Sequence, residues 1–174
     1  MTPLNYVALQ FVAIGILSLT NCTQKDSSPP KLNQPAKSIS INTGGCYGPC
    51  PVFDLSLDST GKGIYTGRYY VKKTGEHDFK VNAADFENLR VHLAQYRPIG
   101  KKVYDSGDAC SEGFVTDNPS VLIKWDNSDE LYIYLGCRFK NSEKISDAVY
   151  NSWRKLPIDY LVGSDEQRDS YKGF

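Results

Sequence analysis

The sequence predicts an α+β domain in which an antiparallel sheet, built from hairpins, carries two helices on one face. Three observations lead to this fold class. Short segments alternate apolar and polar residues, and Gly- or Asp-rich turns separate them, as in hairpin strands. Two longer segments repeat apolar residues at helical spacing. The expected order, three strands followed by a helix, occurs twice, and such an order favours an α+β architecture over alternating βαβ units.

The first half of the domain is expected to begin with three strands. Phe53, Leu55 and Leu57 alternate with polar residues, which predicts a half-buried strand over residues 53–58. A Gly-rich turn then reverses the chain, and residues 64–72 are expected to form the returning strand of a hairpin. Alternation resumes over residues 77–81 and predicts the third strand.

A helix should follow these strands directly. Asn82 is a suitable N-cap residue, and Asp85 stands three residues later. Pro98 ends the predicted element. The apolar residues of the helix recur at helical spacing and should lie on the sheet: Phe86, Leu89, Leu93 and Tyr96.

The second half repeats this order in a weaker form. Residues 102–105 predict a short strand, and residues 120–125 and 130–135 predict a hairpin across a polar turn. A helix is expected over residues 142–156, where Pro157 ends it. Residues 158–162 are then expected to pack as a last extended segment.

Composition excludes some classes of function. The 174 residues contain 20 Lys and Arg and 20 Asp and Glu, so no excess of one sign is available to attract nucleic acid. A mean hydropathy of −0.42 with 12% aromatic residues is typical of a globular domain. No hydrolase or metalloprotease motif occurs, and we predict no catalytic residue, no metal site and no cofactor.

The N-terminus indicates export. Residues 6–19 form an apolar run that is short for a membrane span and suitable for a signal peptide over residues 1–21. The run ends in Leu-Thr-Asn-Cys, which looks like a lipobox with Cys22 as the lipidated residue, carrying acyl chains such as palmitate. Asn21 and the absence of Lys or Arg before the run depart from that pattern. Cleavage by the general signal peptidase and an uncleaved anchor are the alternatives.

The rest of the chain divides into three parts. Residues 22–37 follow the lipobox and contain prolines and small polar residues, so they are expected to form a flexible tether. Residues 38–163 are expected to form one globular domain. Residues 164–174 form a charged tail.

Four cysteines follow the lipobox, and an even number in an exported chain favours disulfides, for which three connectivities exist. We predict the pairs Cys46–Cys50 and Cys110–Cys137. A Gly/Pro turn can bring the first two cysteines close together. Cys110 stands before the predicted hairpin and Cys137 just after its second strand, so a bridge between them would tie the incoming loop to the strand end. A thiol–disulfide redox centre at Cys46 and Cys50 is one alternative, although a strand rather than a helix follows them. A four-cysteine zinc site is another, but an oxidising compartment opposes it.

The stretch Gly45-Cys46-Tyr47-Gly48-Pro49-Cys50-Pro51-Val52-Phe53 is the sharpest motif of the domain. It resembles the G-C-x-G-x-C-P-x-[Tyr/Phe] signature of a bacterial lipoprotein-like family of unknown function, and the resemblance extends to about residue 163. It implies a fold and a location in the cell envelope, on the periplasmic face of the outer membrane, and no activity.

Tyrosines suggest a binding surface. Tyr132 and Tyr134 alternate with apolar residues, and Tyr65 and Tyr69 share a parity in the first hairpin, so the four rings are expected on one sheet face opposite the core. Such a face could stack on glycans or bind an envelope protein. Half-exposed tyrosines without a function are the alternative.

These observations together predict an exported, lipid-anchored envelope protein whose disulfide-stapled domain is a non-enzymatic binding or structural module. Its expected partners are the membrane, through the anchor, and an envelope protein or glycan. The alternative is a redox protein or enzyme that uses Cys46 and Cys50.

Overall fold

The structure, a computed structural model, describes residues 34–126 and 128–166. The predicted signal peptide, Cys22, most of the predicted tether and the end of the charged tail lie outside the described residues. Within the described ranges, no helix is long and apolar enough to span a membrane.

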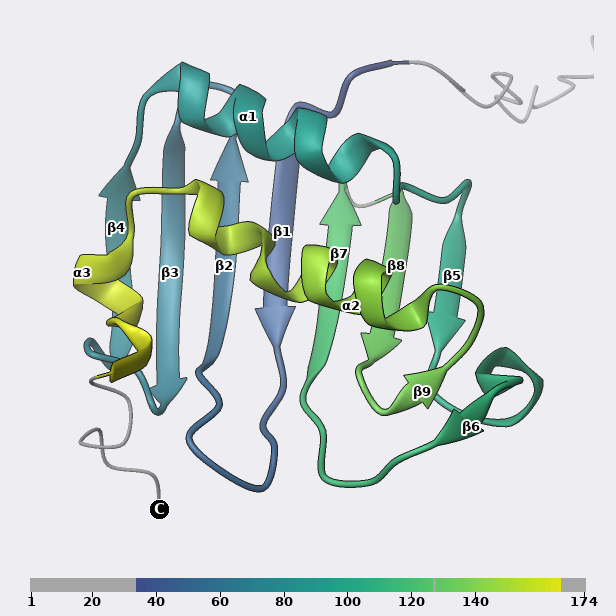
Figure 1. The fold of residues 1–174 in the computed structure, drawn as a ribbon. Coiled ribbons are helices and arrows are strands. Elements are labelled where there is room, and N and C mark those ends of the chain that lie inside the picture. The colour runs from purple at the N-terminus through teal and green to yellow at the C-terminus, as the bar shows by residue number, and fades with distance from the viewer. Residues whose placement is uncertain (1–33, 127, 167–174) are drawn as a thin grey trace, which may run out of the picture. The chain divides into compact units, whose positions relative to one another are not determined.

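A seven-stranded sheet forms the centre of the domain, in the order β4-β3-β2-β1-β7-β8-β5 (Figure 1). Neighbouring strands are antiparallel except for β5 and β8, which are parallel. The strands of this sheet are β1 (Ser38–Thr43), β2 (Val52–Asp58), β3 (Lys62–Tyr69), β4 (Gly75–Lys80), β5 (Lys101–Tyr104), β7 (Ser120–Trp125) and β8 (Asp129–Tyr134). A separate two-stranded ribbon contains β6 (Gly113–Phe114) and β9 (Cys137–Arg138).

The helices cover one face of the large sheet (Figure 1). They are α1 (Ala83–Ala94), α2 (Ser142–Tyr150), the 3₁₀ helix η2 (Asn151–Lys155) and the short α3 (Asp159–Val162), while the 3₁₀ helix η1 (Gly107–Cys110) precedes the ribbon. The α+β class and the mostly antiparallel sheet agree with the sequence. The predicted order of three strands and a helix, given twice, is not confirmed, because four strands precede α1 and five lie between α1 and α2.

Strand β1 was not predicted from the sequence, yet it lies at the centre of the sheet between β2 and β7. Its Ser-Ile-Ser-Ile-Asn-Thr sequence supplies only two large apolar residues, and it lies between the Pro-rich segment and the Gly-rich motif. Ile39 and Ile41 are both buried under the helices. The strand is therefore held by its two neighbours rather than by a strong local pattern.

The C-terminal part of the domain also differs from the prediction. The helix expected over residues 142–156 is α-helical only to Tyr150 and continues as the 3₁₀ helix η2. Residues 158–162, expected to be extended, form the helical turn α3 instead. The carbonyls of Leu161 and Val162 accept hydrogen bonds from the backbone of Lys73 and Lys72, so α3 is fixed against the turn after β3. Contacts distant in sequence therefore decide its conformation.

The core lies between the sheet and the helices. The Trp153 indole packs edge-on against Phe53, with ring centroids 5.7 Å apart, and Phe53 lies 5.6 Å from Tyr65. On α1, the predicted residues Phe86, Leu89 and Leu93 are buried. The predicted N-terminus of that helix is confirmed, since Asp85 accepts a hydrogen bond from the backbone of Asn82 at 3.1 Å. The buried set gives the domain one continuous core.

Residues 34–37, which the sequence assigns to the tether, lie against the domain. The side chain of Ala36 is 5% exposed. Arg97 donates a hydrogen bond to the carbonyl of Gln34 at 3.2 Å, and the Asp126 carboxylate accepts from the backbone N–H groups of Lys37 and Ser38 at 2.8 and 2.9 Å. The chain is thus fixed to the domain before β1 begins, at the end of the sheet where β1 starts.

Candidate functional site

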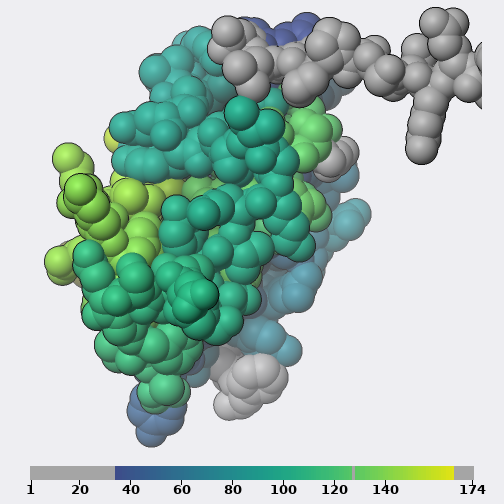
Figure 2. All heavy atoms as spheres, turned by 90° about the vertical axis from the view of Figure 1, so that its right-hand side faces the viewer, coloured from purple at the N-terminus to yellow at the C-terminus, as the bar shows by residue number. Residues whose placement is uncertain are grey.

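The motif forms the loop of residues 44–51, here called the distal loop, which joins β1 to β2. It lies at the opposite end of the sheet from residues 34–38, because β1 runs between them (Figure 1). A side view shows this blue segment projecting at the bottom of the molecule (Figure 2). We call residues 34–38 the tether junction, and it lies at the opposite end of the domain from the distal loop.

The distal loop is braced internally. Cys46 and Cys50 form a disulfide, with Cα atoms 5.8 Å apart. Between them, Gly48 adopts a φ of +146°, a conformation that favours glycine. At the end of the loop, the Thr43 hydroxyl donates to the carbonyl of Pro51 at 2.8 Å and accepts from the backbone of Phe53 at 3.0 Å. These contacts restrict how far the loop can move.

The distal loop is also held by the first residue of β7 and by the segment before it. The backbone N–H of Gly44 donates to the carbonyl of Ser120 at 2.9 Å, and that of Tyr47 donates to the carbonyl of Asp117 at 3.4 Å. A Cβ atom on Gly44 would lie 2.3 Å from the Ser120 hydroxyl oxygen, so only glycine permits this approach without a shift. Two segments far apart in the sequence thus form one end of the molecule.

The second disulfide supports the neighbouring ribbon. Cys110 at the end of η1 bonds to Cys137 in β9, with Cα atoms 4.9 Å apart. The backbone of Glu112 donates to the carbonyl of Arg138 at 2.9 Å, and that of Val115 donates to Gly136 at 2.8 Å. Both disulfides have the pairing predicted from the sequence. The bridge from Cys110 to Cys137 is buried, whereas Cys46 and Cys50 are half-buried.

Large exposed side chains gather at this end. Tyr47 is 91% exposed, Phe114 52% and Val115 47%. Phe114 stacks on the ring of Tyr134, with centroids 5.1 Å apart and planes at 23°. We call Tyr47, Phe114, Val115 and Tyr134 the tip cluster. Phe114 and Val115 are adjacent exposed residues beside the ring of Tyr134, and exposed apolar side chains that lie together are more typical of a contact surface than single scattered residues are.

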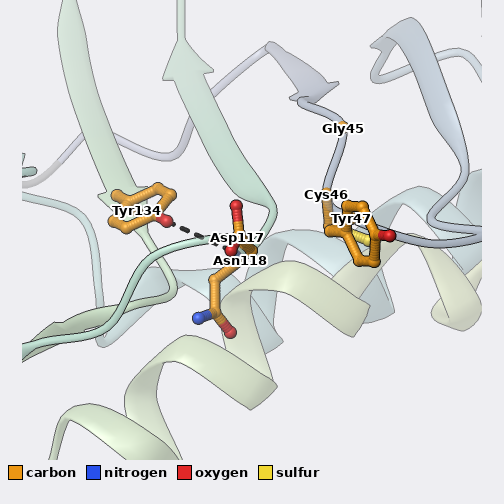
Figure 3. Close-up of a pocket in the computed structure, with 6 residues that line it drawn as sticks. All are labelled: Gly45, Cys46, Tyr47, Asp117, Asn118 and Tyr134. Carbon is orange, nitrogen blue, oxygen red and sulfur yellow. Dashed lines mark hydrogen bonds between the residues drawn. The ribbon is translucent and has the colours of Figure 1, made fainter.

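A shallow, open depression of about 410 Å³ lies within the tip (Figure 3). Tyr47 borders it on one side and Tyr134 on the other, with Asp117 and Asn118 between them. The backbone N–H of Asn118 donates to the Tyr134 hydroxyl at 3.1 Å. The Asn118 amide Nδ2 donates to the carbonyls of residues 115 and 116 at 3.3 and 2.9 Å. The lining is polar and aromatic, and its geometry is fixed by the backbone of two loops.

The predicted tyrosine face is wrong in part. Tyr65 pairs with Leu55, and the same cross-strand row continues through Ile41 and Ile123 to Leu131. Every member of this row is buried under the helices, so Tyr65 is a core residue with no exposed surface. Burial raises the pKa of Tyr65, whose neutral hydroxyl lies 3.5 Å from the carbonyl of Leu161.

The other three tyrosines are separated too. Tyr132 and Tyr134 alternate with the buried Leu131 and Ile133, so they lie on the sheet face opposite the helices, as predicted. Tyr69 ends β3, beyond a register shift in its pairing with β2, and three strands separate β3 from β8. Only Tyr134 of the four predicted residues borders the depression.

The geometry around Cys46 and Cys50 bears on the redox alternative. Low-pKa cysteines of thioredoxin type lie at a helix N-terminus, where the helix dipole stabilises the thiolate. Here β2 follows Cys50, and no helix begins in the distal loop. For residues 34–126 and 128–166, no group of three or more His, Cys, Asp or Glu side chains is placed to hold a metal ion.

Sequence reasoning missed Tyr47, Phe114, Asp117 and Asn118 as site residues. Tyr47 was visible between two cysteines, where a bridged loop leaves a side chain little to pack against. The other three belong to a segment without a periodic pattern, and only the tertiary fold places that segment beside the motif.

The fold and the cysteine geometry define a single α+β domain stapled by two disulfides, with an exposed aromatic tip. By sequence, the chain belongs to the family described as a domain of unknown function (DUF6438), whose model matches residues 37–155. The match runs from the tether junction to the end of η2 and includes both disulfides and the tip cluster. No curated protein and no solved structure matches the chain.

Proposed function

We propose that this chain is an exported, lipid-anchored protein of the bacterial cell envelope, and that its domain is a non-enzymatic binding module. The tip cluster is the surface that contacts the partner. Cys22 carries the lipid anchor, on the periplasmic face of the outer membrane. The apolar run that ends in the lipobox-like tetrad supports export and anchoring. Two disulfides suit an oxidising compartment outside the cytoplasm.

One observation carries the binding role: the tip cluster lies at the end of the sheet opposite the tether junction. An anchor before residue 34 is joined to the domain through the Arg97 and Asp126 contacts. Tyr47 and Phe114 therefore lie at the end of the domain away from residues 34–38. Non-enzymatic binding agrees with the structural role of the histidines and cysteines, since the ring of His92 lies 2.9 Å from the carbonyl of Ala148 and the cysteines are paired.

Anchoring is tested by metabolic fatty-acid labelling and membrane fractionation of the wild type and of Cys22→Ala. We expect a labelled wild type in the membrane fraction and an unlabelled, released variant. An unlabelled wild-type protein in the soluble fraction would overturn the anchoring proposal.

The binding role is tested by photo-crosslinking in the native envelope. A photoreactive phenylalanine replaces Tyr47 in one variant and Ile99 in its control, since Ile99 is 74% exposed near the tether junction. We expect a distinct crosslinked product, identified by mass spectrometry, only from position 47. Equal products from both positions, or none from position 47, would contradict a partner surface at the tip.

A further inference from the structure

Tyr47 carries a large, exposed side chain in the distal loop. Cys46 and Cys50 form the bridge, Gly48 supplies the turn, and the Pro51 carbonyl accepts from Thr43. The Tyr47 ring, by contrast, is 91% exposed. Its backbone is held by the adjacent bridge and by the carbonyl of Asp117. The loop thus presents an exposed aromatic ring on a restrained backbone, which reduces the backbone entropy lost when a ligand stacks on the ring.

The residues that line the depression restrict the chemistry of a ligand. Neither Lys nor Arg lines it, which disfavours phosphate and other anions, and the Asp117 carboxylate repels them further. The Asn118 Nδ2 already donates to two carbonyls, so its Oδ1 is the atom that can accept a further hydrogen bond. Carboxylate and amide oxygens are acceptors for hydroxyl donors. The depression is shallow and open, so a ligand would lie across it and stay partly in contact with solvent.

From these features we infer that the depression binds an uncharged oligosaccharide. A sugar ring stacks its C–H face on Tyr47, where the negative face of the aromatic ring attracts polarised C–H groups. The sugar hydroxyls donate hydrogen bonds to the Asp117 carboxylate and to Oδ1 of Asn118. Because the depression is open, the neighbouring sugars of the same oligosaccharide extend into solvent along the tip. This inference rests on the proposed function and names the class of its ligand.

The test uses the purified domain with both disulfides intact and isothermal titration with defined sugars. The probes are cellohexaose, maltohexaose and the hexamer of N-acetylglucosamine, with hexagalacturonate as an anionic control. We expect saturable binding of at least one uncharged probe, with a Kd of roughly 10 µM to 1 mM. Hexagalacturonate should bind more weakly than any uncharged probe that binds, since its carboxylates face Asp117.

Variants of Tyr47 identify the stacking contact. Tyr47→Phe keeps the ring and should leave the Kd within about twofold, whereas Tyr47→Ala should weaken it roughly three- to tenfold or more. Tyr160→Ala, which removes a ring 50% exposed on α3, is the control and should leave the Kd unchanged. Asp117 has a φ of +64°, a conformation that asparagine also tolerates, so Asp117→Asn should keep the backbone unchanged. This variant should weaken binding several-fold because a charged acceptor is lost.

The outcomes separate this inference from the proposed function. No saturable binding of any uncharged probe below about 5 mM, or an unchanged Kd for Tyr47→Ala, would overturn the saccharide ligand. If position 47 nevertheless crosslinks to an envelope protein, the binding module stands and its partner is a protein. If neither a sugar nor a crosslink is found, both proposals fail.

Discussion

The hydroxyl of Tyr134 accepts a hydrogen bond from the backbone N–H of Asn118 at 3.1 Å. The same ring stacks under Phe114 and borders the depression. Tyr134 therefore joins the end of β8 to the segment before β7, and its ring supports the tip while forming part of its surface.

We expect Tyr134→Phe to lower the free energy of unfolding by about 1 kcal/mol, because the N–H of Asn118 loses its acceptor while the stack on Phe114 remains. Urea denaturation measures the change. Tyr132→Phe is the matched control, two residues away on the same face, where the part of the chain described by the structure offers its hydroxyl no hydrogen bond. An equal loss in both variants would contradict a specific role for the Tyr134 hydroxyl.

Tyr65 and Tyr132 should respond differently to truncation, although the sequence placed them on one surface. Tyr65→Ala removes a fully buried ring that packs on Phe53, and we expect a loss of about 3–5 kcal/mol. Tyr132→Ala removes a half-buried ring from a cross-strand row and should cost about 1 kcal/mol. Thermal unfolding of both variants is the measurement. Similar losses would show that the two rings share an environment.

The two disulfides should differ in their contribution to stability. On the loop-entropy model, the bridge from Cys110 to Cys137, which closes 27 residues, contributes about 3.5 kcal/mol. The bridge from Cys46 to Cys50, whose cysteines are separated by 4 positions in the sequence, contributes about 2 kcal/mol. Paired Cys→Ser variants compared by urea denaturation test this order. A larger loss from the short bridge would mean that the tip supports the domain more than its loop length suggests.

Asp129 links stability to pH. Partial burial raises the pKa of this carboxyl, but hydrogen bonds from the backbone of Gly100 and from Arg97, at 2.9 and 2.6 Å, outweigh it and hold the pKa below its usual value of 3.8. A depressed pKa in the folded state adds stability above the unfolded value, and this stability is lost as the pH falls through the folded value.

The stability difference between the wild type and Asp129→Asn should therefore be largest above about pH 5 and should shrink as the pH falls below about 4. Denaturation at several pH values measures it. Asp78→Asn, which changes an exposed carboxylate on the edge strand β4, is measured at the same pH values as the control. A difference that does not change with pH would contradict the role of the ionised carboxylate.

Local physical chemistry determined much of this protein in advance. The alternation of Phe53, Leu55 and Leu57 marks β2, because a strand exposes successive side chains to opposite faces. The N-cap at Asn82 and the apolar stripe of α1 could be predicted because both depend on residues only three or four positions apart in the sequence. The pairing of Cys46 with Cys50 follows from the short turn between them. Each of these features depends on residues close together in the chain.

The tertiary structure alone decided the features that depend on register between distant strands. Strand β1, weak as a local pattern, is central because β2 and β7 both pair with it. Tyr65 is buried, and not part of a surface, because its cross-strand row leads through three intervening strands to Leu131 rather than to Tyr132. The tip exists because Gly44 and Tyr47 form hydrogen bonds with the first residue of β7 and with the segment before it, more than sixty residues away. Parity within one strand is local, but which faces align across a sheet is set only when every strand has its partner.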